Sequence, residues 1–401
     1  MKNPDVAKSA SYGILRSLKL LRMTESVIDQ RALMDENRKK IDELRGGIDA
    51  IDHEILVLLN RRAELVIDIG RAKSKDKSEF YVPEREQEIF KRLAESNRGP
   101  FPTKALKAVF REIMSASLSL EKPQKIAFLG PVATFTHQAC LQRFGTSGEF
   151  IPKKDIADVF DDVEKGRADY GVVPIENSTE GVVSHTLDMF VTSGLQICAE
   201  VMLEISLALL NKSGKMSDIQ RVCSHPNPLA QSKHWLKSNL PDALVLEVSS
   251  TARAAQMAAE DPSTAAVASS AAASLYELRV IESSIEDNAN NFTRFLVIGK
   301  NCTKRTGADK TSVMFAIKDS PGALYTMLQP FAKRGINLTK IESRPLKTKA
   351  WEYVFFVDLD GHIDDDGLKD AIGELKGACS FLKVLGSYPK STPHGADAQN
   401  R

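Results

Sequence analysis

The clearest hydrophobic pattern in the chain is an apolar stripe that begins just after Met34. No proline occurs between Asp35 and Val82, so the pattern predicts one helix over residues 35–74. Such a helix is about 60 Å long at ~1.5 Å per residue, whereas its segment folded alone would be roughly 26 Å across. The segment cannot bury this stripe by itself, and we therefore expect an intertwined dimer. The stripe consists of Ile41, Leu44, Ile48, Ile51, Ile55, Leu58, Leu59 and Leu65.

Helical patterns also predict two shorter helices, over residues 83–96 and 102–121, separated by the breaker Gly99–Pro100. Upstream, residues 1–33 are mildly basic and lack the uninterrupted apolar core of a signal peptide. We interpret residues 1–33 as an N-terminal extension, either disordered or included by a start site placed too early.

Residues 123–302 change character, because short apolar strands now alternate with helical patterns. This alternation is typical of an α/β fold with a largely parallel sheet, here with two lobes. The predicted strands are 125–129, 170–175, 203–210, 221–224, 244–248, 265–268 and 292–298, and the predicted helices are 134–144, 156–165, 227–239 and 251–260.

Residues 308–389 follow the order β-α-β-β-α-β, which is that of ferredoxin-like α+β domains. Residues 390–401 form a polar tail. The predicted strands are 312–317, 337–343, 352–359 and 380–387, and the predicted helices are 322–334 and 365–376.

Composition excludes several classes of protein. The 401 residues include 54 Lys plus Arg and 53 Asp plus Glu, so the net charge is +1, whereas a nucleic-acid-binding protein usually has a basic excess. No stretch of 18 apolar residues is free of charges, which argues against a membrane span. The five cysteines include no C-x-x-C pair and signal neither a disulfide framework nor a zinc site. A reduced, cytoplasmic compartment fits best.

Several charged side chains interrupt the amphipathic pattern of the helical segment. Arg45 and Arg62 lie next to core positions, and Lys73 follows Arg62 by eleven residues, about three turns, so the two share a face. Arg85 and Glu86 open the second predicted helix. Each of these charged residues alone would be interpreted as a surface residue. Their combination with the long helix favours a binding site for an anion.

The helical segment resembles the all-helical chorismate mutases in four motifs. They are L-R-x-x-I-D-x-I-D at Leu44–Asp52, R-R-x-E-L-x-x-x-I-G-x-A-K at Arg61–Lys73, R-E at Arg85–Glu86 and S-L-x-x-E at Ser117–Glu121. Val82 departs from the family pattern, because some relatives carry an aspartate there.

The resemblance implies a role for each matching residue. Arg62 and Arg45 would hold the two substrate carboxylates, with Arg45 supplied by the partner subunit, and Lys73 would bind a carboxylate and the ether oxygen. Further substrate contacts are implied for Arg85, for Glu86 at the ring hydroxyl, for Ser117 and for Glu121 at the ether oxygen.

The implied reaction suits these residue types. Chorismate rearranges to prephenate in a pericyclic step that needs a compact conformer and stabilisation of charge on the ether oxygen. Arginine forks hold carboxylates in a fixed geometry. Glutamic acid donates to the ether oxygen only when protonated, so we expect mutase activity to decline as the pH rises.

Polar runs at the ends of predicted strands often face a ligand crevice, although Asn, Ser and Thr also favour caps and turns. In the α/β segment these runs together resemble prephenate dehydratase, whose most diagnostic element is Thr-Arg-Phe. Ala133 departs mildly, because glycine is common there. The motifs are G-P-x-x-T-F-T-H at Gly130–His137, P-I-E-N-S at Pro174–Ser178, S-H-P-x-x-x-A-Q at Ser224–Gln231, S-S-T-A at Ser249–Ala252 and N-x-T-R-F at Asn291–Phe295.

By this resemblance Thr293 donates a hydrogen bond near the leaving hydroxyl of prephenate, and Arg294 binds or orients a carboxylate. If residues 293–295 are regular strand, Thr293 and Arg294 point to opposite faces, so both touch substrate only if the strand begins later. His225 is either a general acid or part of a turn, with the structural interpretation slightly favoured. Asn177, Ser178 and Gln231 would line the site.

The C-terminal segment carries Ser320–Leu324 at a strand-to-helix turn and Glu342–Pro345 after the second strand. These two runs resemble the phenylalanine-binding regulatory ACT domain. Gly322 at the helix start lets backbone N–H groups approach a carboxylate. The resemblance implies an amino-acid site at a dimer interface, formed by Gly322, Ala323, Leu324, Glu342, Ser343 and Arg344.

The whole chain thus resembles the bifunctional chorismate mutases/prephenate dehydratases with a C-terminal ACT domain, feedback-inhibited by L-phenylalanine. The expected domains are an all-α mutase over 34–122, a two-lobed, periplasmic-binding-like dehydratase over 123–302 and an ACT domain over 308–389. The resemblance implies no metal and no cofactor, no nucleic-acid or membrane partner, and a cytoplasmic homodimer or homotetramer.

Two alternatives remain at this point. A mutase fused to prephenate dehydrogenase would need a dinucleotide fingerprint, and Gly130–Ala133 is not G-x-G-x-x-G. The two predicted lobes and the predicted sensor domain would also suit a non-catalytic amino-acid-sensing binding protein. The presence of Thr293, Arg62 and Lys73 argues against this alternative.

Overall fold

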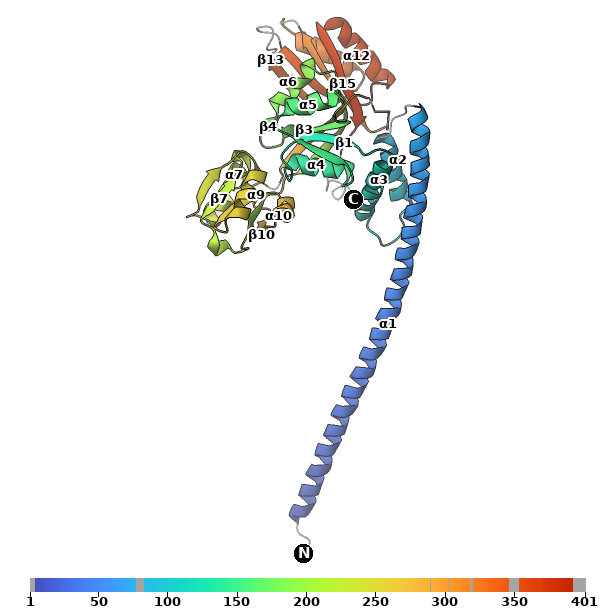
Figure 1. Cartoon of the computed structure of the whole chain (residues 1–401), viewed down its shortest axis with the longest axis vertical. Helices are drawn as coiled ribbons and strands as arrows, with labels where there is room; N and C mark the ends of the chain where they lie inside the picture. Colours follow the sequence, from blue (N-terminus) through green and yellow to red (C-terminus); the bar gives the residue numbers. More distant parts are fainter. Residues whose placement is uncertain are drawn as a thin grey trace. The chain divides into compact units, whose positions relative to one another are not determined.

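The computed structural model describes residues 4–76, 83–288, 290–301, 303–317, 320–345 and 353–391, with side chains from 37–73 and from Arg85 onward. Val82 and the predicted tail beyond Ser391 lie outside these residues. Residues 1–68 and 69–401 form two structural units. Figure 1 follows the chain from the N-terminal helix through two lobes to a C-terminal domain.

One helix, α1 (Pro4–Asp76), spans the first segment, and α2 (Pro83–Ser96) and α3 (Thr103–Glu121) follow it. The predicted start of the first helix near residue 35 is wrong, because residues 4–33 are helical and α1 continues through Met34 without a break. Pro4 sits in the first turn, where a helix tolerates proline, and no further proline interrupts the stretch. The interpretation of residues 1–33 as an N-terminal extension stays a prediction.

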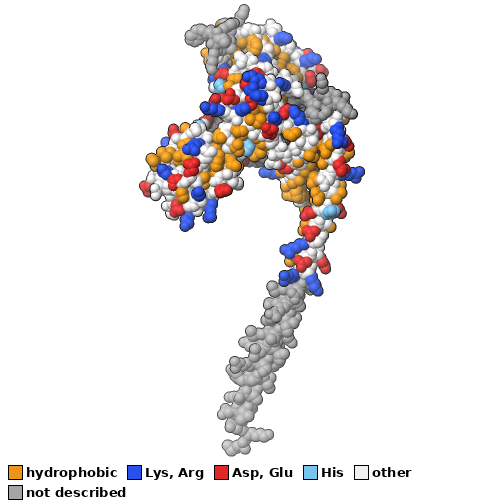
Figure 2. All heavy atoms as spheres, viewed as in Figure 1, with side chains coloured by type: hydrophobic (Ala, Val, Ile, Leu, Met, Phe, Trp, Pro, Cys, Tyr) orange, Lys and Arg blue, Asp and Glu red, His pale blue; other side chains and the backbone are white. Residues whose placement is uncertain are grey.

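The apolar stripe of α1 is exposed within a single chain. Leu44 is 62 % exposed and Ile51 is 57 % exposed, and Figure 2 shows apolar side chains on the surface of the described part of α1. Fully burying one such side chain stabilises a fold by about 1.5–3 kcal/mol. The stripe therefore has the character of a packing surface.

The first lobe of the α/β segment, lobe 1, is built on a six-stranded mixed sheet of order β2-β1-β3-β11-β5, with β4 paired to β3. Its helices pack against buried apolar strands that carry several residues with no exposure at all. The elements are β1 (Lys125–Leu129), α4 (Phe135–Phe144), β2 (Glu149–Lys153), α5 (Ile156–Glu164), β3 (Tyr170–Asn177), β4 (Gly181–Val182), α6 (Ser184–Thr192), β5 (Gln196–Glu204) and β11 (Phe292–Gly299).

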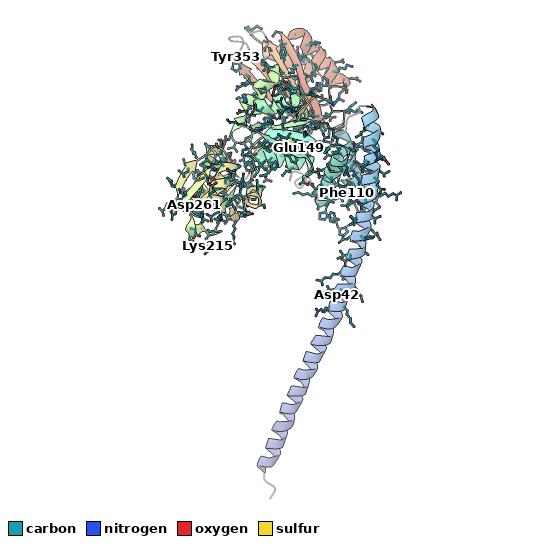
Figure 3. All side chains as sticks on the ribbon, viewed as in Figure 1. Asp42, Phe110, Glu149, Lys215, Asp261 and Tyr353 are labelled. Atoms are coloured by element: carbon teal, nitrogen blue, oxygen red, sulfur yellow. The ribbon has the colours of Figure 1, made fainter. Side chains whose placement is uncertain are left out.

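The second lobe, lobe 2, is an insertion between β5 and β11, with a sheet of order β10-β6-β9-β7-β8. Lys215 and Asp261 mark this lobe in Figure 3. The elements are β6 (Ala208–Asn211), the 3₁₀ turn η1 (Met216–Asp218), β7 (Arg221–Ser224), α7 (Pro226–Gln231), α8 (Lys233–Asn239), β8 (Leu244–Glu247), α9 (Thr251–Glu260), β9 (Thr264–Ala268), α10 (Ser270–Leu275) and β10 (Arg279–Ser283).

Three predictions for these lobes are corrected. The predicted strand 203–210 is two strands, because the apolar run crosses between lobes and the Ile205 N–H donates to the Asn291 carbonyl at 2.8 Å instead of continuing β5. The predicted helix 227–239 breaks at Ser232, whose ψ of 14° departs from helical geometry. The sheets are mixed rather than largely parallel, because β11 is antiparallel to both neighbours and β6 is antiparallel to β9 and β10.

The C-terminal domain has the predicted β-α-β-β-α-β order and an antiparallel sheet of order β13-β14-β12-β15. Its two helices pack on one face of that sheet through a common apolar cluster. The elements are β12 (Asp309–Ile317), α11 (Ala323–Lys333), β13 (Leu338–Pro345), β14 (Tyr353–Asp360), α12 (Asp366–Ala378) and β15 (Phe381–Pro389).

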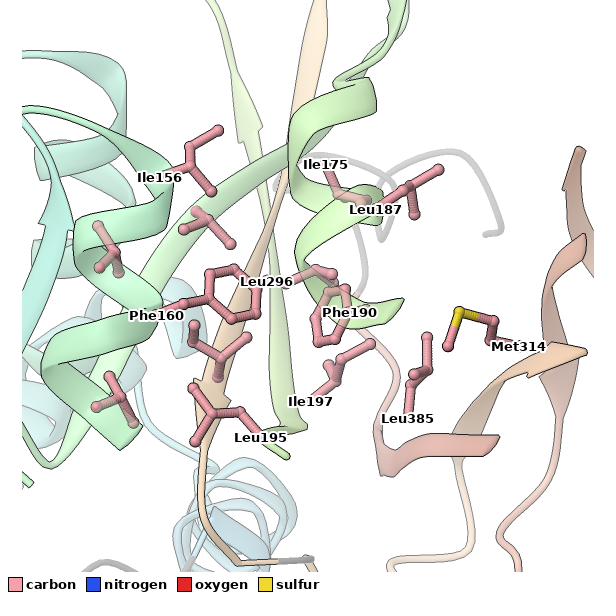
Figure 4. Packing of buried hydrophobic residues seen from close by; sticks show 14 of the residues in the cluster. Ile156, Phe160, Ile175, Leu187, Phe190, Leu195, Ile197, Leu296, Met314 and Leu385 are labelled. Carbon is pink, nitrogen blue, oxygen red and sulfur yellow. The ribbon is translucent and has the colours of Figure 1, made fainter. Parts of the chain in front are cut away.

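The other face of this sheet shares a hydrophobic core with lobe 1. Met314 and Leu385 pack in the same cluster as Phe190 and Ile197 of lobe 1 (Figure 4). At Gly386 the two backbones come so close that a Cβ would overlap the backbone of Ile197. Lobe 1 and the C-terminal domain are therefore joined by buried apolar contacts and not by a loose tether.

Candidate active sites

Asn177 and Thr293 face each other across neighbouring strands of lobe 1. They are register partners in the antiparallel pair β3/β11, and the Asn177 Nδ2 donates to the Thr293 Oγ1 at 2.8 Å. The amide is oriented by its Oδ1, which accepts from the backbone N–H groups of Thr179 at 2.9 Å and Glu180 at 3.0 Å. Because Thr293 accepts through its oxygen, its own proton can be donated to a bound molecule.

Asn291 connects this pair to lobe 2. Its Oδ1 accepts from the Asn177 Nδ2 at 2.8 Å, and its Nδ2 donates to the Gln231 Oε1 at 2.9 Å. Asn291 is only 1 % exposed, so its amide is a buried group with both ends satisfied, which favours a single arrangement. The N-x-T-R-F motif contains Asn291, but the residue roles predicted from sequence missed it.

Glu180 is a second residue that sequence reasoning missed. Its carboxylate accepts from the side-chain amide of Asn227 and, at 3.1 Å, from the Gln231 Nε2. Glu180 follows β3 in lobe 1, whereas Asn227 and Gln231 lie on α7 in lobe 2. The carboxylate of Glu180 therefore bridges the two lobes. The only sequence signal for this role is that Glu180 lies two residues after the P-I-E-N-S motif.

The side chains of Ser178 and His225 form hydrogen bonds with nearby backbone groups. The Ser178 Oγ donates to the Asn290 carbonyl at 3.2 Å and accepts from the Phe292 N–H at 2.9 Å, so it ties the end of β3 to the start of β11. The His225 Nδ1 accepts from the Asn227 N–H at 3.3 Å and caps α7. This placement agrees with the structural interpretation of His225.

Arg294 faces away from the Thr293 site. Strand β11 already runs through both residues, so their side chains alternate to opposite faces of the sheet. The guanidinium is 5 % exposed and donates to Glu200 at 2.7 Å, Asp358 at 2.6 Å and the Tyr388 hydroxyl at 3.0 Å. Direct binding of a substrate carboxylate by Arg294 is therefore not supported, because protein groups occupy its donors, and an orienting role stays a prediction.

These surroundings fix the charges of the buried groups. Burial disfavours the guanidinium charge, but Tyr388, Asp358 and Glu200 outweigh it and raise the pKa of Arg294. Burial likewise opposes ionisation of Asp358, yet Arg294 lowers its pKa below the ordinary value. Burial raises the pKa of Tyr388, which keeps the hydroxyl protonated. The result is a buried, fully charged Arg294–Asp358 pair between lobe 1 and the C-terminal domain.

Lys73 and Glu121 meet where the end of α1 packs on the end of α3. The Lys73 Nζ lies 3.4 Å from the Glu121 Oε2, and the Glu121 side chain is 7 % exposed. Gly70 permits the approach, because a Cβ there would lie 3.1 Å from the Glu121 Cγ. Ser117 lies one turn before Glu121 and donates to the Ile113 carbonyl at 2.6 Å. Gly70 belongs to the I-G-x-A-K motif but was given no role from sequence.

The other predicted site residues of the helical segment are on α1 and α2, and the contacts described do not join them to Lys73 and Glu121. Arg45 and Arg62 are on α1, where Arg45 is exposed and pairs with an aspartate one turn earlier at 3.5 Å. Arg85 is exposed on α2 and pairs with a glutamate one turn later at 2.8 Å. Glu86 pairs with Arg143 of α4 at 2.8 Å, so it links the helical segment to lobe 1.

The predicted sensor residues lie at two places in the C-terminal domain. Gly322 precedes α11 with a φ of 78°, a left-handed conformation that favours glycine, and Ala323–Leu324 form the first turn. Glu342–Arg344 lie in β13, where side chains alternate between a half-buried and an exposed face, with Ser343 on the exposed one. The Arg344 Nη1 donates to the Ser184 Oγ of lobe 1 at 2.7 Å.

Three family models match consecutive parts of the chain. They are chorismate mutase type II over residues 44–122, prephenate dehydratase over 126–303 and the ACT domain over 311–377. A bifunctional chorismate mutase/prephenate dehydratase of Aquifex aeolicus is 54 % identical over 357 residues, which cover 88 % of this chain and 99 % of that protein. The chain belongs to the bifunctional chorismate mutase/prephenate dehydratase family. The predicted family and its two enzyme classes are confirmed.

A relative with the same description from Pseudomonas aeruginosa is 42 % identical over 361 residues, covering 88 % of this chain and 99 % of that protein. A solved prephenate dehydratase from Arthrobacter aurescens, in complex with L-Phe, matches with a TM-score of 0.62 and 38 % identity, covering 66 % of this chain and 90 % of that one. The predicted three-part fold class is confirmed. Below, α1–α3 are called the mutase module, the two lobes the dehydratase module, and the C-terminal domain the ACT domain.

Proposed function

We propose that this chain rearranges chorismate to prephenate, converts prephenate to phenylpyruvate, and is inhibited by L-phenylalanine. The observation that carries the proposal is the hydrogen-bonded set Asn177, Asn291, Thr293 and Gln231, which joins both lobes around one hydroxyl. We propose no metal and no organic cofactor for either reaction.

The dehydratase step breaks two bonds of prephenate, releasing carbon dioxide and the ring hydroxyl. Thr293 is a weak acid, so its role is to donate a hydrogen bond to the departing hydroxyl, while Asn177 fixes the direction of that bond. Gln231, on lobe 2, places an amide next to the same site. Closure of the lobes around the substrate would exclude water and orient it.

The mutase step breaks the ether C–O bond and forms a C–C bond within one molecule. An ammonium group beside the ether oxygen stabilises the charge that develops there, and the Lys73 side chain lies next to Glu121, the other residue proposed for this oxygen. Arg62, with Arg45 of a second copy, would hold the carboxylates. The exposed stripe of α1 supplies the surface through which that second copy would pack.

Regulation by L-phenylalanine is supported by the ACT match and by the Arthrobacter aurescens structure, which is a complex with L-Phe. The ligand would contact Gly322–Leu324 and Glu342–Arg344. The proposed extents are 34–122 for the mutase, 123–302 for the dehydratase and 308–389 for the ACT domain. We further propose a homodimer or homotetramer located in the cytoplasm. Within the described part of the chain, no helix is long and apolar enough to cross a membrane.

The test is an assay of the purified full-length chain with chorismate, with and without L-phenylalanine, together with its mass in solution. Formation of prephenate followed by phenylpyruvate, with phenylpyruvate formation suppressed by phenylalanine, supports the proposal. Failure to form either product contradicts the corresponding reaction, and a monomeric mass contradicts the shared mutase site.

A further inference from the structure

Two neighbouring residue pairs on β3 and β11 point in opposite directions. Asn177 and Thr293 are register partners, and the next pair along the strands is Glu176 and Arg294. Because side chains alternate along a strand, Glu176 and Arg294 lie on the face of the sheet opposite the site. The ACT domain supplies a charged partner to each of them.

Lys340 on β13 forms an ion pair with the carboxylate of Glu176. The Lys340 side chain is 15 % exposed and that of Glu176 is 31 % exposed. Burial lowers the pKa of Lys340, although the nearby carboxylates of Asp358 and Glu342 oppose this shift. A poorly hydrated charge depends on its partner, so the pair constrains where Glu176 lies.

Glu176 immediately precedes Asn177 in the same strand, so a shift of its backbone moves the amide of Asn177 as well. That amide sets the direction of the Thr293 hydroxyl through the bond of 2.8 Å. The Arg294–Asp358 pair holds the backbone of β11 in the same way from the same side. Both strands of the dehydratase site are therefore supported from behind by the ACT domain.

We propose that Lys340 is a positioning residue for prephenate dehydration, acting through Glu176 on Asn177 and Thr293. The inference rests on the proposed role of Thr293. It makes the ACT sheet a part of the support of the dehydratase site, because Lys340 of β13 contacts the residue that directly precedes Asn177. Lys340 lies two residues before Glu342 on the same face of β13, so a displacement of the proposed sensor run displaces it too.

Lys383 on β15 is a matched control. It also crosses from the ACT domain to lobe 1, where it donates to the Phe190 carbonyl at 2.8 Å and to the Ser193 carbonyl. Burial lowers the pKa of Lys383 as well. Its partners lie at the end of α6, away from the strand positions that carry Asn177 and Thr293.

The experiment compares Lys340→Met, Lys383→Met, Lys340→Arg and Glu176→Gln in the full-length protein, with prephenate as substrate. We expect Lys340→Met to lower the dehydratase kcat about tenfold with KM changed less than twofold, because misplacement of the donor costs rate and not binding. Lys383→Met should keep the wild-type kcat, and Lys340→Arg should recover most of it. Urea unfolding of each sample reports whether the dehydratase and ACT parts are folded, and the mutase rate, measured with chorismate, reports the state of the mutase module.

If Lys340 acts through Glu176, Glu176→Gln lowers kcat to the same extent and the double variant is no slower than either single one. A Lys340→Met enzyme as fast as Lys383→Met overturns the proposal, and so does a Glu176→Gln enzyme with wild-type kcat. A wild-type chain that does not dehydrate prephenate overturns the proposed function instead, which keeps the two failures distinct.

Discussion

The mutase and dehydratase modules differ in how complete the proposed site of each module is within a single chain. In the dehydratase module, hydrogen bonds already join Asn177, Thr293 and Gln231 across two lobes. In the mutase module, Lys73 and Glu121 meet, while the stripe of α1 stays exposed and Arg45 pairs only with a neighbour on its own helix among the contacts described. We propose that the two-lobed fold completes its site during folding, whereas the mutase module, with its uncovered stripe on a long helix, completes its site only on association.

The sharpest way to break this comparison is to separate the two activities. Thr293→Ala should lower the dehydratase kcat about 10³-fold, because it removes the hydrogen-bond donor proposed for the leaving group, and should leave the mutase rate unchanged. Arg62→Ala should do the reverse. Both rates are measured on the same sample, and a folded variant that loses both activities would mean that the sites are not independent.

The Arg294–Asp358 pair should make the dehydratase and ACT parts sensitive to acid. Asp358→Asn leaves a buried guanidinium with one partner fewer and should destabilise the fold at neutral pH by about 3 kcal/mol. In the folded state the pKa of Asp358 lies below its ordinary value of 3.8. The contribution of the Asp358 carboxylate to the free energy of unfolding is therefore complete above pH 3.8, and it is lost as the pH falls through the folded-state pKa. Urea unfolding at pH 7 and pH 3 checks this: the gap between variant and wild type should narrow at pH 3, and a constant gap would contradict it.

Association should be required by one module only. Ile51→Asp places a charge on the exposed stripe and should cost about 2 kcal/mol per subunit, or roughly 30-fold per subunit in the dimer dissociation constant. On dilution the variant should lose mutase activity at a higher protein concentration than wild type, while dehydratase activity is retained. Asn60→Asp adds the same charge at a polar position of the same helix and should behave like wild type. Parallel loss of both activities would show that the dehydratase also needs the partner.

The smallest expected effect concerns a turn in lobe 1. Ala133 has a φ of 68°, in the left-handed region, and its N–H donates to the His137 Nδ1 at 3.3 Å. Ala133→Gly should stabilise the protein by about 1 kcal/mol by relieving this strain. Ala139→Gly, in the regular helix α4, should instead destabilise by about 1 kcal/mol or more. Thermal unfolding of both variants decides the sign, and a lower midpoint for Ala133→Gly would be contrary to expectation.

The parts predictable from sequence are those decided by local pattern and motif. The order of elements in the ACT domain follows from alternation and spacing, and Asn177, Thr293 and Gln231 were implied by the resemblance of their motifs to prephenate dehydratase. The side of a strand on which Arg294 would find partners was not predictable, because Glu200 and Asp358 come from distant parts of the chain. The prediction of one strand over residues 203–210 was wrong for a related reason. Both lobes bury apolar residues, so hydrophobicity does not show where the chain passes from one lobe to the other.

The insertion of lobe 2 has a consequence for synthesis of the chain. Strand β11 lies between β3 and β5 in the sheet of lobe 1, yet it is made only after the whole of lobe 2. At ~5–20 residues per second, the stretch from Ile205 to Asn291 occupies the ribosome for roughly 4–17 s, during which β3 and β5 lack their common neighbour. Lobe 2, continuous in sequence, can fold in that interval. The nascent chain therefore completes the lobe that is second in sequence before the one that is first.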